Sequence, residues 1–187
     1  MIKTFVLSFL IIPAALIISG CNKEADEQIH KTAAGEFLWK ENLSVSDIAD
    51  FPVKAFLNGK AVQISFVVFE VWRGSNDNVL NFSLVKPQQP CGFIDNYQGF
   101  QIINKGAPIN RGEWLKAKFD DNPGSYLSLY KFIDSDNNPR KSDCDWNCSL
   151  EIDNITPKIV SGKIALCFND KDKSWIAGNF EAVVCNN

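Results

Sequence analysis

Apolar side chains recur at every second residue in the last third of the chain. Residues 160–168 and 176–184 each alternate apolar with small or polar residues, which is the period of a β-strand, whose successive side chains face opposite sides. The segment between them, residues 169–173 (NDKDK), is entirely polar. The pattern therefore predicts a β-hairpin with a polar turn.

A second hairpin is predicted earlier in the chain. Residues 62–72 (VQISFVVFEVW) are β-branched and aromatic and are apolar on nearly both faces, which is typical of a central strand. A turn cluster at 74–78 leads into an alternating run at 80–84 that would form its partner. Further strands are expected at 99–103, 114–119 and 126–133. One short helical turn is expected at 46–50.

About eight strands without an amphipathic helix indicate an all-β fold. We expect an antiparallel β-sandwich or barrel in a single domain. The chain has 187 residues, of which 45% are hydrophobic and 12% aromatic, enough for one core and too apolar for a disordered protein. The formal net charge of −3 lacks the positive charge on which nucleic-acid binding rests, so we expect no nucleic-acid partner.

The first twenty residues have the composition of an export signal. Lys3 precedes an apolar run at 5–18, which is shorter than the ~20 residues that a spanning helix needs. The run ends in Ile18-Ser19-Gly20-Cys21, which resembles the lipobox of bacterial lipoprotein signal peptides, with Ile in place of the usual Leu. The resemblance implies cleavage before Cys21, a diacylglycerol on its sulfur and acylation of the new amino terminus, and several acyl chains anchor a protein stably in a membrane.

The resemblance also implies a location and a division of the chain. Asn22 is not the Asp that retains lipoproteins at the inner membrane of enteric-type bacteria, so we expect an outer-membrane anchor with the domain facing the periplasm. The predicted segments are a signal peptide at 1–20, the lipidated Cys21 with a polar tether at 21–35, and one β-domain at 36–187. Residues 51–62 and 161–185 are loosely similar to pieces of uncharacterised secreted bacterial β-domains, a resemblance that implies no activity.

Five of the six cysteines remain once Cys21 carries lipid. An oxidising compartment favours disulfides, but an odd number allows at most two within the chain. The sequence leaves the connectivity open, and the surplus thiol is either buried or available to another molecule. The candidates are Cys91, Cys144, Cys148, Cys167 and Cys185.

The sequence offers little for catalysis. The single histidine, His30, lies in the predicted tether, which excludes a Ser-His-Asp or Cys-His arrangement within the domain. No phosphate-binding or dinucleotide-binding motif occurs, and we expect no cofactor. Most acidic residues lie in turn clusters, but Glu70 lies inside a strand on the face of Phe66 and Val68. It is a candidate buried acid, unless the strand end is exposed there or a basic side chain pairs with it.

Two features of residues 134–148 are candidates for binding. Asp134, Asp136 and Asn138 resemble the first half of an EF-hand calcium loop, but Pro139 stands where that loop needs Gly, so we expect a polar hairpin turn and no metal. Trp146 lies between two cysteines in what reads as a polar loop. We expect it to be exposed and to contact a ligand.

The sequence is compatible with three functions. The first is an envelope-anchored lipoprotein whose non-catalytic β-domain binds an envelope protein or a small ligand. The second is an inhibitor or chaperone of a periplasmic enzyme that acts through a loop. The third is a carboxylate-dependent hydrolase built on Glu70, which needs a second acid within about 5–10 Å.

Overall fold

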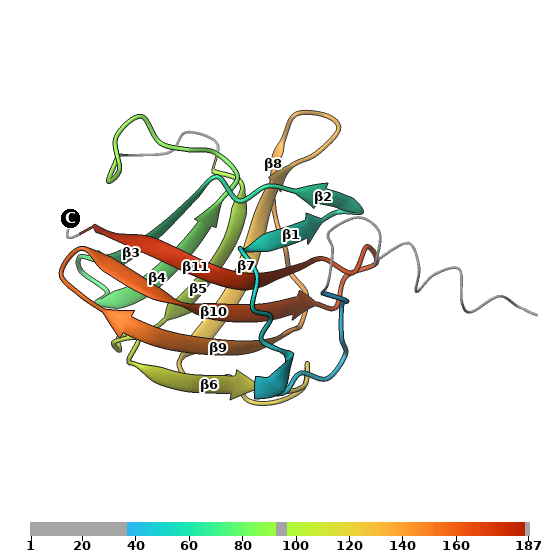
Figure 1. Ribbon diagram of the computed structural model, residues 1–187. Helices are drawn as coiled ribbons and strands as arrows, with labels where there is room; N and C mark the ends of the chain where they lie inside the picture. Colours follow the sequence, from blue (N-terminus) through green and yellow to red (C-terminus); the bar gives the residue numbers. More distant parts are fainter. Residues whose placement is uncertain (1–36, 93–96, 186–187) are drawn as a thin grey trace, which may run out of the picture.

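The computed structural model describes residues 37–92 and 97–185 (Figure 1). The predicted signal peptide, Cys21 in its lipobox and the tether lie outside the described residues. The described part contains eleven strands and one 3-10 turn. These are η1 (Val45–Asp47), β1 (Lys54–Leu57), β2 (Lys60–Val62), β3 (Phe66–Trp72), β4 (Asp77–Ser83), β5 (Gly99–Asn104), β6 (Gly112–Lys116), β7 (Tyr126–Ile133), β8 (Pro139–Lys141), β9 (Trp146–Ile155), β10 (Ile159–Phe168) and β11 (Trp175–Cys185).

The strands form one strongly curled mixed sheet, a half-barrel, and the prediction of an all-β fold is confirmed. Nine strands follow each other in the order β6-β9-β10-β11-β3-β4-β5-β7-β8, and β1 and β2 form a side branch from β11. β6, at one end of this path, and β7, next to the other end, approach each other through side chains: the rings of Trp114 on β6 and Tyr126 on β7 stack at a centroid distance of 4.1 Å.

One neighbouring pair departs from the predicted antiparallel arrangement. β11 runs parallel to β3, with Val183 opposite Val68 and Cys185 opposite Glu70. Parallel neighbours need a long connection, and here the chain forms seven further strands between the two. The first part of β11 pairs with β1 instead, so the C-terminal strand joins both branches of the sheet.

Both predicted hairpins are confirmed, but one long strand was missed. β3 pairs with β4 and β10 pairs with β11, each antiparallel. Residues up to Cys148 were predicted to lie in a polar loop, whereas β9 starts at Trp146 and runs for 10 residues. Its residues do alternate, because Trp146, Cys148 and Leu150 face the core while Asn147 and Ser149 face the other side.

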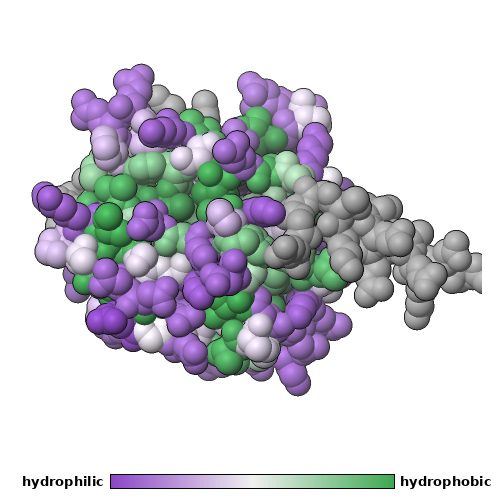
Figure 2. Space-filling model, viewed as in Figure 1, coloured by the Kyte–Doolittle hydropathy of each residue, from purple (hydrophilic) through white to green (hydrophobic). Residues whose placement is uncertain are grey.

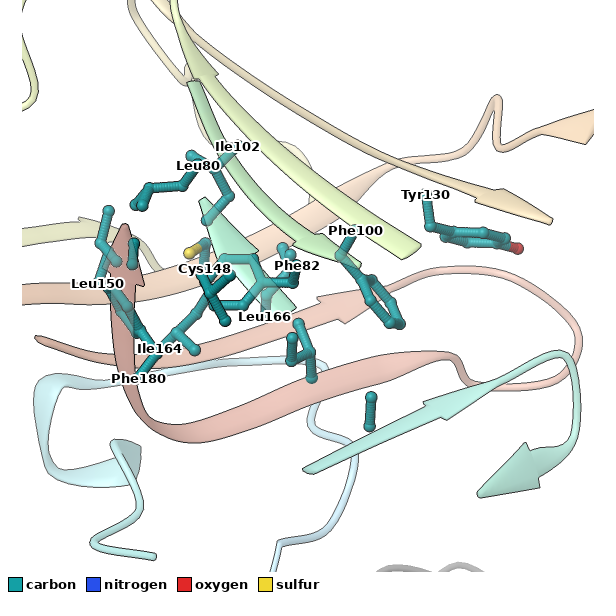
Figure 3. Close-up of a cluster of buried hydrophobic side chains, with 14 of the residues drawn as sticks. Leu80, Phe82, Phe100, Ile102, Tyr130, Cys148, Leu150, Ile164, Leu166 and Phe180 are labelled. Carbon is teal, nitrogen blue, oxygen red and sulfur yellow. The ribbon is translucent and has the colours of Figure 1, made fainter. Parts of the chain in front are cut away.

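The main core fills the inner side of the half-barrel (Figure 3). It takes alternate residues from each strand, as the pleat of a sheet requires. Aromatic rings interlock within it, and Phe82 on β4 meets Phe180 on β11 edge to face with centroids 5.2 Å apart. Other large side chains of this cluster are Leu80, Phe100, Ile102, Leu150, Ile164 and Leu166.

The outer face is covered in two places by segments without long strands. Residues 37–53 cross in front of β9, β10 and β11 (Figure 1) and seal an apolar cluster that includes Phe37, Leu43 and Trp175. The chain passes very close at Gly178, where an added Cβ would lie 2.5 Å from the carbonyl oxygen of Phe51. The space-filling view of this face shows hydrophobic side chains at the surface between hydrophilic loops (Figure 2).

Candidate functional site

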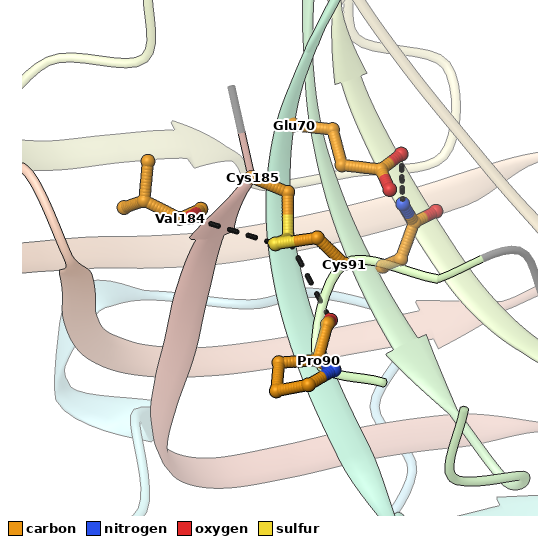
Figure 4. The surroundings of a disulfide bond; sticks show 6 residues. Glu70, Pro90, Cys91, Val184 and Cys185 are labelled. Atoms are coloured by element: carbon orange, nitrogen blue, oxygen red, sulfur yellow. Dashed lines mark hydrogen bonds between the residues drawn. A yellow bond between two sulfur atoms is a disulfide. The ribbon is translucent and has the colours of Figure 1, made fainter. Parts of the chain in front are cut away.

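The second cover of the outer face consists of residues 84–92, which we call the strap. A disulfide between Cys91 and Cys185 joins the strap to the end of β11 (Figure 4). At its start, the Leu84 amide donates to the carbonyl of Gln98 at 2.9 Å. Gly99 permits this path, because its φ is +139° and an added Cβ would lie 2.0 Å from the carbonyl oxygen of Phe82.

The strap and the sheet border a cavity of about 160 Å³ that is open to solvent on one side. Cross-strand partners share a face of the sheet, and the register places Val68 opposite Asn81 and Asn81 opposite Gln101. Polar and charged side chains from four strands therefore meet on one floor. The floor is Phe66, Val68, Glu70, Asn81, Gln101 and Lys131, and the walls are Pro87, Pro90, Gly92 and Tyr97.

Two buried amides form the centre of this floor. Asn81 and Gln101 are only 5% and 6% exposed. The Gln101 amide nitrogen donates to the Asn81 side-chain oxygen, and the Asn81 nitrogen donates to Glu70 Oε2 at 3.2 Å. Burying an amide is unfavourable unless it is hydrogen-bonded, so this network is what permits two polar side chains to lie at the bottom of the cavity.

Glu70 is half-buried, so the prediction of a buried acid is only partly met. Its Oε2 also accepts a hydrogen bond of 3.2 Å from the indole nitrogen of Trp72. Both of these donors are neutral, and in the described part of the chain no Lys or Arg lies within ion-pair distance of Glu70. The carboxylate thus faces the cavity without a cationic partner among the described residues.

Lys131 and Tyr97 form the opposite side of the cavity. The Lys131 ammonium lies 5.6 Å from the centroid of the Tyr97 ring, and among the described residues it has no carboxylate within ion-pair distance. The Tyr97 hydroxyl donates to the Phe100 carbonyl at 2.9 Å. Burial, together with the negative charge of Glu70, raises the pKa of Tyr97, so this residue stays a neutral phenol at physiological pH.

The cysteines form one disulfide, within the predicted limit of two. Cys144, Cys148 and Cys167 are free. Cys148 and Cys167 cannot pair with each other because they face opposite sides of the sheet, in the main core and in the outer apolar cluster. Burial raises the pKa of Cys167 to about 12, and burial with three nearby aspartates raises that of Cys144 to about 11. At neutral pH both are therefore protonated.

The calcium-loop candidates form the turn between β7 and β8, as the hairpin interpretation predicts. Asp134 Oδ1 accepts backbone hydrogen bonds from Asp136 at 3.0 Å and Asn138 at 2.8 Å. Its Oδ2 pairs with the Arg140 guanidinium at 2.6 Å. These contacts hold the pKa of Asp134 below its usual value. Both of its carboxylate oxygens therefore bind groups of the same hairpin. Within residues 37–92 and 97–185, no three His, Cys, Asp or Glu side chains are grouped to hold a metal.

The expectation that Trp146 is exposed is wrong. The side chain is 7% exposed because Trp146 opens β9 and points into the core. Its ring lies 6.0 Å from that of Trp114, and the buried Lys116 ammonium lies 5.2 Å from its centroid. Trp146 therefore stabilises the seam of the half-barrel and offers no exposed surface to a ligand.

Comparison with other proteins supplies no relative. No protein-family model matches the chain, and no curated protein or solved structure is significantly similar to it. In the described part of the chain, no helix is long and apolar enough to cross a membrane.

Of the polar residues on the cavity floor, only Glu70 was a candidate from the sequence. Asn81 lies between two core residues of β4, and Gln101 lies likewise in β5. Each was compatible with an ordinary solvent-facing position of an alternating strand. An amide flanked by large apolar residues in two adjacent strands was the available signal. The strap that buries both amides has no periodic pattern and could not be anticipated.

Proposed function

We propose that this protein is an envelope-anchored binding domain that captures a small polar ligand in the cavity between the strap and the sheet. The observation that carries the proposal is the pair of buried amides, Asn81 and Gln101, at the floor of a cavity that also holds Glu70 and Lys131. A cavity with a few convergent polar groups on an apolar scaffold is the usual form of a small-molecule site.

The envelope location rests on the lipobox at Cys21. Anchoring by lipid would hold the domain at the outer membrane, facing the periplasm, at the end of a tether spanning about 20 Å on average. The Cys91–Cys185 disulfide agrees with an oxidising compartment. The intact mass of the purified full-length protein tests this part: we expect loss of residues 1–20 and a gain of diacylglycerol and acyl chains. An unmodified Cys21 would contradict it.

Binding is favoured over carboxylate-dependent hydrolysis. Glycoside hydrolysis by carboxylates needs two acids flanking the bond, and Glu70 is the only acid among the described residues that line the cavity. A single carboxylate held by neutral donors can orient a ligand by hydrogen bonding.

One observation favours an inhibitor as the second candidate. The β7–β8 hairpin projects from the half-barrel (Figure 1), and residues 135–141, which form its turn and β8, are all exposed. The Arg140–Asp134 pair braces the turn, as suits a loop presented to an active site. Replacing Asp136 and Asn137 by Gly-Ser should then abolish inhibition of a periplasmic hydrolase, whereas the cavity variants below should leave it intact.

Ligand-observed NMR on the purified full-length protein tests the binding function. The probes are amino acids, dipeptides and monosaccharides, and at least one should show saturation transfer. The variant Gln101→Leu should abolish that signal, because the cavity loses a polar group and gains an apolar one. The matched control is Gln63→Leu, which changes an exposed glutamine away from the cavity. Equal signals in both variants, or none with any probe in the original protein, would overturn the proposal.

A further inference from the structure

The cavity contains one negative and one positive side chain that do not neutralise each other. Glu70 reaches the cavity from β3 and Lys131 from β7. Four ion pairs occur among the described residues, and neither Glu70 nor Lys131 takes part in any of them. The inference that follows depends on the proposed function, because it names the ligand of the same cavity.

Sheet geometry places the two charges at opposite corners of the floor. β4 and β5 lie between β3 and β7, so three strand spacings separate them, about 14 Å. Lys131 lies in the cross-strand row of Phe66, whose partners are Ser83 and Gly99. Glu70 is four residues further along β3, a rise of about 13 Å. The two side chains therefore face the cavity from its two ends and do not meet.

The middle of the floor carries no net charge. Asn81 and Gln101 lie between the two ends, hydrogen-bonded to each other. The Asn81 amide also donates to Glu70, which orders the carboxylate without neutralising it. The walls are mainly Pro87, Pro90 and the Tyr97 ring, which remove water from one side of the floor. A charge at a partly desolvated site binds an opposite charge more strongly than it would in bulk water.

The size of the cavity limits the ligand. Its volume of about 160 Å³ has room for on the order of ten water-sized groups. That excludes a folded macromolecule and suits an amino acid or a dipeptide. A ligand that bears only one charge would leave either Glu70 or Lys131 without a partner.

We propose that the cavity binds a small zwitterion of dipeptide size, whose ammonium lies at Glu70 and whose carboxylate lies at Lys131. The two buried amides then contact the peptide-like middle of the ligand. The peptide unit suits them because its N–H can donate to a side-chain amide oxygen and its C=O can accept from a side-chain amide NH2.

The test compares the dipeptide Ala-Ala with its two single-charge analogues. N-acetyl-Ala-Ala lacks the ammonium and Ala-Ala-amide lacks the carboxylate. Isothermal titration of each into the full-length protein should give an affinity for Ala-Ala at least about tenfold above that of either analogue, because each loses one charge-assisted contact. Equal affinities for the three would overturn the zwitterion assignment.

Two variants identify which end holds which charge. Glu70→Gln should weaken Ala-Ala about tenfold and leave N-acetyl-Ala-Ala unchanged, whereas Lys131→Met should weaken Ala-Ala and leave Ala-Ala-amide unchanged. Glu181→Gln and Lys60→Met remove exposed charges elsewhere and should change nothing. If the cavity variants weaken both ligands equally, the assigned orientation is wrong.

Failure of this inference is distinguishable from failure of the proposed function. If monosaccharides bind in a manner that Gln101→Leu abolishes while Ala-Ala does not bind, the cavity is a binding site for a neutral ligand and only the zwitterion is refuted. If no probe binds, or if binding survives Gln101→Leu, the cavity itself is refuted as a binding site.

Discussion

The two covers on the outer face of the sheet use opposite means of attachment. Residues 37–53 seal β9, β10 and β11 with an apolar cluster, in which the Phe37 and Trp175 rings lie 5.0 Å apart. Hydrogen bonds reinforce the seal: Trp39 Nε1 donates to the Phe168 carbonyl at 2.8 Å, and the Asn147 amide donates to the Glu41 carbonyl at 2.8 Å. The strap instead lies over a polar floor and is joined by a disulfide.

The contrast shows that the outer face is packed with apolar side chains under residues 37–53 and lined by polar side chains beside the strap. An apolar cover is stabilised by the surface it buries, and no covalent link is needed. A cover over Glu70, Asn81 and Gln101 gains little from burial, since polar groups lose hydration there. A disulfide can hold such a segment in place, because it stabilises the folded state by restricting the unfolded chain. This stabilisation does not depend on the side chains that the strap contacts. We infer that the part of the outer face beside the strap is the functional part.

The largest expected loss of stability follows from a substitution beneath residues 37–53. Trp175 is fully buried beneath residues 37–53, so Trp175→Ala should lower the free energy of unfolding by about 3–5 kcal/mol. Phe66 is a partly exposed aromatic residue on the cavity floor. Phe66→Ala should therefore lower the free energy of unfolding by less than half as much as Trp175→Ala. Urea denaturation of both variants checks this, and equal losses would show that the two covers pack alike.

Removal of the disulfide should cause the next largest loss of stability, and it should also affect ligand binding in the cavity beside the strap. The bond links residues 94 apart, and loss of such a crosslink costs about 2–4 kcal/mol. Cys91→Ser with Cys185→Ser should therefore lower the urea midpoint and also weaken ligand binding in the cavity. Cys144→Ser removes a free thiol and serves as control. Unchanged binding without the disulfide would mean that the strap keeps its place by packing alone.

A smaller effect is expected from the buried amide pair. Asn81→Leu leaves the Gln101 amide without its acceptor, and an unsatisfied buried amide costs about 1–3 kcal/mol. Adding Gln101→Met should recover most of that loss, because replacing both partners by apolar groups removes the unpaired group. Thermal unfolding measures both variants. A stable double variant without ligand binding would separate function from stability; a double variant less stable than the single would contradict the argument.

The smallest effect concerns the three free thiols. The thiolate is the form that reacts, and the pKa of Cys144 is raised to about 11. Its alkylation should therefore be slow at pH 8 and accelerate about tenfold per pH unit towards pH 11. Cys148 and Cys167 are fully buried and should react only after unfolding. Iodoacetamide labelling followed by mass spectrometry gives the order, and rapid labelling of Cys144 at pH 8 would contradict the burial of this thiol.

Strand positions were predictable where alternation was strong. The closing hairpin and the β3–β4 hairpin follow from period-two patterns that local sequence carries. β9 was missed although Trp146, Cys148 and Leu150 alternate with polar residues, because two cysteines and neighbouring aspartates resemble a loop. The parallel pairing of β11 with β3 depends on contacts between residues more than 110 positions apart, which no local pattern specifies.

The candidate site was predictable only at Glu70. An acid inside an apolar strand is unusual enough to be noticed from sequence alone. Asn81, Gln101 and Lys131 are ordinary residues for the outward face of a strand, and only the strap makes them a cavity floor. The choice of Cys185 as the partner of Cys91 likewise follows from where β11 ends beside β3.

The sequence by itself determined the all-β class and the two hairpins, because these depend on residues close together in the chain. The tertiary structure decided the half-barrel, the disulfide between Cys91 and Cys185, the burial of Trp146 and the placement of Glu70 and Lys131 at the two ends of one cavity. The physical reason is that a strand's two faces are defined by alternation, whereas what covers each face depends on long-range packing. Part of the outer face of this sheet is sealed by apolar side chains beneath residues 37–53, and another part keeps its polar residues beneath a covalently attached strap.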